Sequence, residues 1–90
     1  MTHWSGTFKS DKNTGTLYFT EAPTANIASF YFNNDDMNNL SMKLMDVSPF
    51  EFKGWDNSWM KIKKQSGNKM KGEYYLATSF SENGEFSLRR

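Results

Sequence analysis

Apolar and polar residues alternate along most of this chain, in short runs separated by polar, turn-forming segments. Trp4, Gly6 and Phe8 share one face of the first run, and Leu17 and Phe19 continue that face on the return strand. A two-residue period of this kind predicts strands that bury one face and expose the other. Further runs with the same period predict strands near residues 27–32, 40–44, 50–53, 60–64, 70–78 and 85–88.

One segment, residues 36–46, fits two interpretations. Leu40, Met42 and Leu44 alternate as in a strand. Apolar residues in the same stretch also recur at helical spacing, and Asp36 is a residue type that can cap a short helix. The alternation favours the strand, and the short helix remains the alternative.

The second half of the chain carries two similar turn signals, Gln65-Ser66-Gly67 and Glu82-Asn83-Gly84. A three-residue linker with glycine in third place is typical of a hairpin in which a type I turn leads into a left-handed residue. Such a linker also predicts a register for the first hairpin. The outward pairs would be Trp59 with Glu73, Lys61 with Lys71, and Lys63 with Lys69.

The predicted fold is therefore an all-β, antiparallel, up-and-down meander of seven or eight short strands. Strands in that number hide their edges by closing, or nearly closing, into a small barrel. The ninety residues form one predicted domain, residues 1–90, whose small core depends on large side chains. The predicted core consists of Trp4, Phe8, Leu17, Phe19, Phe30, Phe32, Phe52, Met60, Ile62, Tyr74, Leu76, Phe86 and Leu88.

The two terminal hairpins resemble small calycin-type barrels of the lipocalin-like or avidin-like kind. The similarity rests on the strand Trp4-Ser5-Gly6-Thr7-Phe8 and on the closing strand from Gly84 to Arg89. The resemblance implies an up-and-down barrel with a pocket at one mouth. An aromatic pocket near Trp4 and Trp55 is the ligand site that would follow from it.

Composition offers little for catalysis. The chain has no cysteine and one histidine, His3, near the N-terminus, which argues against thiolate chemistry, a zinc site and a nucleophile–histidine pair. We expect a non-enzymatic protein without a cofactor or bound metal. Since no apolar run approaches the length of a membrane span and no signal segment is seen, we expect a cytoplasmic protein without membrane contact.

The predicted register suggests one binding surface. Lysines would face each other twice on the outer side of the first hairpin, and facing like charges are unfavourable. With aromatic residues at its border, this surface suits an acidic protein partner. The predicted partner-binding residues are Trp59, Lys61, Lys63, Lys69, Lys71 and Tyr75.

The leading functional prediction is therefore a protein-interaction module of the inhibitor or adaptor kind. The alternatives are a calycin-like binder of a small apolar ligand and, less favoured, a non-specific binder of single-stranded nucleic acid. Tyr18, Tyr31 and Met45 also fall on outward positions, which a homodimer would bury.

Overall fold

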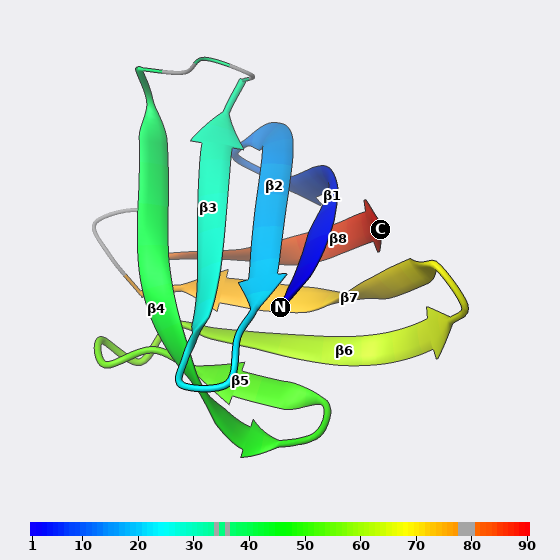
Figure 1. The fold of residues 1–90 in the computed structure, drawn as a ribbon. Helices are drawn as coiled ribbons and strands as arrows, with labels where there is room; N and C mark the ends of the chain where they lie inside the picture. Colours follow the sequence, from blue (N-terminus) through cyan, green and yellow to red (C-terminus); the bar gives the residue numbers. More distant parts are fainter. Residues whose placement is uncertain (34, 36, 78–80) are drawn as a thin grey trace.

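Eight antiparallel strands form a closed barrel in a computed structural model that describes residues 1–33, 35, 37–77 and 81–90 (Figure 1). Each strand pairs with the next along the chain, and β8 returns to β1 to close the barrel. The strands are β1 (Thr2–Ser10), β2 (Thr14–Glu21), β3 (Asn26–Phe32), β4 (Asn39–Ser48), β5 (Glu51–Lys53), β6 (Trp59–Ser66), β7 (Lys69–Leu76) and β8 (Glu82–Arg89). The predicted all-β meander and its closure are confirmed.

The segment with two interpretations is a strand. β4 pairs with β3 from Asn39 to Leu44, and its side chains alternate, with Met42 and Leu44 buried and Lys43 exposed. The helical alternative for residues 36–46 is therefore wrong, because pairing with β3 decides a stretch whose local sequence allows both forms. Asp36, its expected cap, lies outside the described residues. No helix in the described part of the chain is long and apolar enough to span a membrane.

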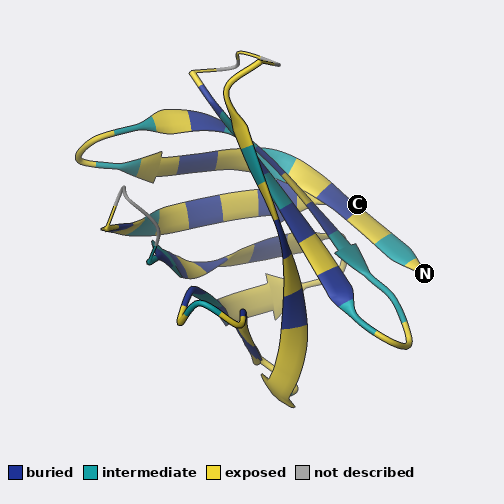
Figure 2. Cartoon of the chain, turned by 90° about the vertical axis from the view of Figure 1, so that its left-hand side faces the viewer, coloured by how far each residue is buried: buried dark blue, intermediate teal, exposed yellow. Residues whose placement is uncertain are grey.

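Alternation of buried and exposed residues along the strands, lost only in the second halves of β4 and β6, places one face of the sheet in the core (Figure 2). All thirteen predicted core residues are buried, and Ala28, Met42, Leu44 and Met70 join them. Aromatic rings fill much of the interior in edge-to-face contact. The Phe8 ring lies 5.1 Å from that of Phe30 and 5.7 Å from that of Tyr74, centroid to centroid. Such contacts between rings stabilise a core beyond the burial of their area.

The second predicted turn is wrong. β8 already begins at Glu82, and Gly84 lies within it, opposite Tyr74. β7 ends at Leu76, and Thr78, which was expected at the end of this strand, lies outside the described residues. Gly84 serves close packing instead of a turn, because a Cβ there would overlap the carbonyl oxygen of Lys9 and lie 2.8 Å from the Tyr74 hydroxyl.

Candidate anion-binding surface

Four cationic side chains gather on the outer face of β6, β7 and β8, near the β6–β7 turn. Lys64 of β6 lies opposite Lys71 of β7. Lys69, two residues before Lys71 on the same face, lies opposite Arg89 of β8. We call Lys64, Lys69, Lys71 and Arg89 the basic cluster. Their remaining cross-strand neighbours at these positions are Ser5, Ser66 and Ser87, so no acidic residue faces the cluster in the described sheet.

A β-bulge in β6 builds this arrangement. The register between β6 and β7 shifts between Ile62 and Lys64, leaving Lys63 as the extra residue. Ile62 points into the core on one side of the bulge, and Lys64 faces Lys71 on the other. Without the extra residue, strict alternation would place Lys64 on the same face as Ile62.

The predicted register of this hairpin is wrong. β6 ends at Ser66 opposite Lys69, so the connection is the two-residue turn Gly67-Asn68 and not the linker 65–67. Gly67 has a φ of 58°, the positive value that the first central residue of a type II′ turn requires. The moved turn and the bulge together change the pairs.

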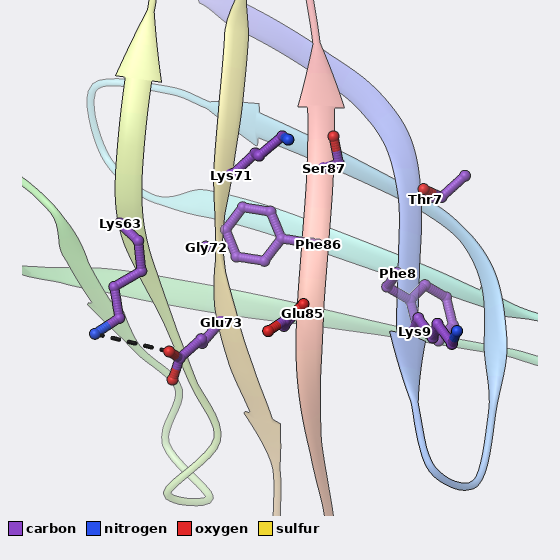
Figure 3. A pocket seen from close by; sticks show the side chains of 10 residues that line it. All are labelled: Thr7, Phe8, Lys9, Lys63, Lys71, Gly72, Glu73, Glu85, Phe86 and Ser87. Atoms are coloured by element: carbon purple, nitrogen blue, oxygen red, sulfur yellow. Dashed lines mark ion pairs between the residues drawn. The ribbon is translucent and has the colours of Figure 1, made fainter.

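The corrected pairs place opposite charges together at one end of the predicted surface. Lys61 lies between Glu51 of β5 and Glu73 of β7, and not opposite Lys71. The Nζ of Lys63, expected opposite Lys69, instead lies 3.7 Å from an Oε1 of Glu73. Glu73 also faces Glu85 of β8, which in turn faces Lys9 of β1 (Figure 3). Positive charge is thus compensated in this row, and the excess remains in the basic cluster.

The aromatic residues of the predicted surface lie beyond this neutral row. Trp59 is opposite Tyr75 and not Glu73, with ring centroids 6.1 Å apart. The Lys61 Nζ lies 4.9 Å from the Trp59 ring centroid, a distance at which a cation is attracted to the ring face. The six predicted partner-binding residues therefore divide. Trp59, Lys61 and Tyr75 form one group, Lys63 pairs with Glu73, and Lys69 and Lys71 belong to the basic cluster.

Shallow grooves border the basic cluster. One, of about 390 Å³, crosses the outer face from Lys63 past Lys71 to Thr7 and Lys9 (Figure 3). Its floor is low because the outward residue Ser87 is small; Gly72 faces inward, where a Cβ would lie 2.7 Å from the Phe86 ring. Another, of about 320 Å³, lies between Lys64, Lys69 and Lys71. Lys71 thus stands between two hollows. Glu73 and Glu85 also line the larger one, so the hollow between the three lysines is the one that suits an anionic group.

The two tryptophans predicted for a ligand pocket have different environments. Trp4 is buried, and its Nε1–H donates a 2.7 Å hydrogen bond to Glu21. Arg90 lies over its ring, 5.2 Å from the centroid. Trp55 is 91% exposed in the loop between β5 and β6. A buried, hydrogen-bonded ring and a ring in solvent do not form the two walls of one pocket.

Sequence reasoning missed a buried acid at one end of the barrel. The Oε2 of Glu82 accepts hydrogen bonds from Ser10 Oγ at 2.9 Å and from Asn13 Nδ2 at 2.8 Å, tying β8 to the β1–β2 turn. Burial, and then the negative charge of Glu82, raise the pKa of Tyr74 to about 12. The sequence carried no sign that Glu82 is buried, because Glu82 belonged to the turn predicted at residues 82–84.

Arg89 and Lys64 were also missing from the predicted surface. Arg89 could have been found by continuing the alternation of β8 to its end, since Glu85 and Ser87 share its outward face. Lys64 could not, because its outward position depends on a bulge that no glycine or proline marks.

No protein-family model matches the chain, and comparison with curated proteins and with solved structures finds no match. The closed barrel agrees with the architecture that the calycin resemblance implies, and membership of that family is not shown. Within the described residues, no three His, Cys, Asp or Glu side chains are grouped so that they could hold a metal ion.

Proposed function

We propose that this protein is a non-enzymatic binding module and that its basic cluster binds an acidic surface of a protein partner. The observation that carries the proposal is the facing of cation with cation, Lys64 with Lys71 and Lys69 with Arg89. Each such pair costs a few tenths of a kcal/mol, up to about 1 kcal/mol, relative to a neutral pair. An acidic partner would relieve that repulsion, whereas lysines that only keep a hairpin soluble need not face each other.

The aromatic residues favour a protein partner over single-stranded nucleic acid. Binding of single strands relies on aromatic faces that are open to stacking bases. The Trp59 ring instead has Lys61 over it and Tyr75 beside it. Trp59 and Tyr75 would therefore contribute packing at the border of a protein interface.

The small-ligand alternative has less support. The residues that would line an interior pocket are packed against one another, as in the 5.2 Å contact between the rings of Phe19 and Phe52. A cytoplasmic location and a homodimer stay predictions.

A matched pair of charge reversals tests the proposal. Lys69→Glu lies in the basic cluster, and Lys43→Glu lies on β4 opposite Ile27; both lysines are exposed. Each lowers the formal net charge from +1 by two, to −1. Binding of a glutamate-rich peptide and of an oligothymidylate would be measured by titration at low and high salt.

We expect the glutamate-rich peptide to bind the unchanged protein. Lys69→Glu should lower the affinity for this peptide at least tenfold, whereas Lys43→Glu should change it less than twofold. The affinity should fall with added salt because both sides of the interface are exposed charges. Equal effects of the two reversals would remove the basic cluster from the site. Tighter binding of the oligothymidylate than of the peptide would replace the protein partner with nucleic acid.

A further inference from the structure

The β6–β7 hairpin continues past the end of β5, and β6 loses one neighbour there (Figure 1). Pairing of β5 with β6 ends at Glu51 opposite Lys61, and one further hydrogen bond runs from the Ile62 N–H to the Phe50 carbonyl at 2.8 Å. Beyond the bulge at Lys63, residues 64–66 go on pairing with β7 as far as Ser66 opposite Lys69. Within the described chain, their other side has no partner strand. The barrel therefore has a short open edge beside its basic cluster.

A groove of about 340 Å³ follows this edge, lined by Phe50, Ile62, Lys63, Lys64 and Gln65. Phe50 is 55% exposed, so more than half of this aromatic side chain is open to solvent in the groove wall. Lys64 stands on the outer face, and Ile62 belongs to the inner face. A strand laid along this edge would thus have one set of alternate side chains beside Lys64 and Ser66, and the other set beside Gln65, with the exposed Phe50 in the same groove.

The charges on this edge select the occupant. Lysines and bulges on an exposed edge discourage pairing with another copy of the same chain, which would bring the same lysines against them. An acidic strand meets no such repulsion, and the lysines of the edge attract it. An added strand also satisfies the backbone groups of the edge, which is how strand addition obtains its affinity.

We infer that the open edge of β6 at residues 63–66 takes an extended segment of the acidic partner as an additional strand, with acidic residues at alternate positions. This inference rests on the proposed function and defines how the partner binds. The acidic side chains of the segment would lie beside Lys64, and the apolar ones would pack on Phe50.

Backbone methylation tests the inference independently of charge. The probe is a short, end-capped peptide that alternates glutamate with valine. Two derivatives carry N-methyl groups, one on every glutamate nitrogen and the other on every valine nitrogen. In an added strand only one of these sets of N–H groups points at β6. We expect one derivative to lose affinity about tenfold, because it lacks N–H groups that would donate hydrogen bonds to β6, and the other to bind like the parent.

Amide hydrogen exchange and a second variant complete the test. The parent peptide should slow exchange at residues 63–66, and Phe50→Ser should weaken its binding. Val47→Ser is the matched control, because Val47 is 60% exposed on β4 and does not line the groove. Equal binding by both methylated peptides, with the loss on Lys69→Glu retained, would overturn strand addition and leave the proposed function standing. Binding of the glutamate-rich peptide without binding of the parent peptide would overturn strand addition alone, and binding of neither would overturn both.

Discussion

Reversing the charge of Lys69 should stabilise the folded protein. Lys69 is exposed, lies opposite Arg89, and shares the outer face of β7 with Lys71 two residues away. Its glutamate replacement would turn both repulsions into attractions. Most substitutions destabilise a protein, so a gain in stability at this position would be a specific sign of repulsion in the basic cluster.

The size of the gain follows from the cross-strand pairs. Facing charges contribute about 0.2–1 kcal/mol per pair, and exposed pairs lie toward the lower end because water and salt screen them. We therefore expect the unfolding free energy of Lys69→Glu to rise by about 0.5–1 kcal/mol at low salt. For a chain of this size, such a gain raises the Tm by about 2–6 °C. Lys69→Gln removes the repulsion without adding attraction, and should give about half of the gain.

Thermal unfolding by circular dichroism, at low salt and near 1 M salt, measures this effect. The gain should shrink strongly at high salt, where the Debye length is about 3 Å. Lys43→Glu has the same change in net charge but faces Ile27, so we expect its Tm to stay within about 2 °C of the unchanged protein. An unchanged or lower Tm for Lys69→Glu would show that the cluster is not electrostatically strained, and the main support of the proposed function would be lost.

Three further predictions concern the barrel itself. Gly84→Ala should lower the unfolding free energy, measured by urea denaturation, by about 3 kcal/mol, because the new Cβ would overlap the Lys9 carbonyl. A loss below about 1 kcal/mol would contradict the close approach of the Gly84 backbone to Lys9. Gly67→Ala should cost about 1 kcal/mol in the same assay, since the site has open space but a φ of 58°; full stability would show that the turn relaxes. Tyr74→Phe should leave the stability at pH 7 equal or higher, because the buried Tyr74 hydroxyl makes no hydrogen bond of good geometry within the described residues and the nearby Ser10 hydroxyl already donates to Glu82. The raised pKa of Tyr74 means that its stabilising contribution is present below about pH 10 and is lost as the pH rises toward about 12. The unfolding free energy, measured by urea titration at several pH values in that range, should therefore fall less steeply with pH for Tyr74→Phe than for the unchanged protein. Parallel pH curves for the two proteins would refute this.

The predicted core survived an error in register because of the size of the error. Lys61 lies opposite Glu73 and not Lys71, a difference of two residues. Side chains in a strand alternate with a period of two, so a shift of two keeps every residue before the bulge at Lys63 on its face, whereas a shift of one would turn the core outward. Alternation in the sequence therefore determined which residues are buried, and the partners across the sheet depended on turn geometry that it did not determine.

The candidate site was harder to predict than the core for the same reason. Which lysines face acids and which face cations depends on pairing, and pairing was set by a two-residue turn and an unmarked bulge. Glu82 could not be predicted either, because its burial depends on contacts with Ser10 and Asn13, more than sixty positions earlier in the chain. Local sequence carries no trace of such a contact.

The bulge at Lys63 connects the stability of the hairpin with its proposed binding role. A bulge and a row of lysines are both devices that keep an open edge from pairing with a second copy. The same bulge turns Lys64 outward, where it adds a cation opposite Lys71 and raises the local repulsion. Protection of the edge alone needs positive charge on β6, not a matching set on β7 and β8, yet Lys69, Lys71 and Arg89 supply one. The basic cluster therefore carries more positive charge than edge protection needs. An acidic strand that binds at this edge would neutralise that excess.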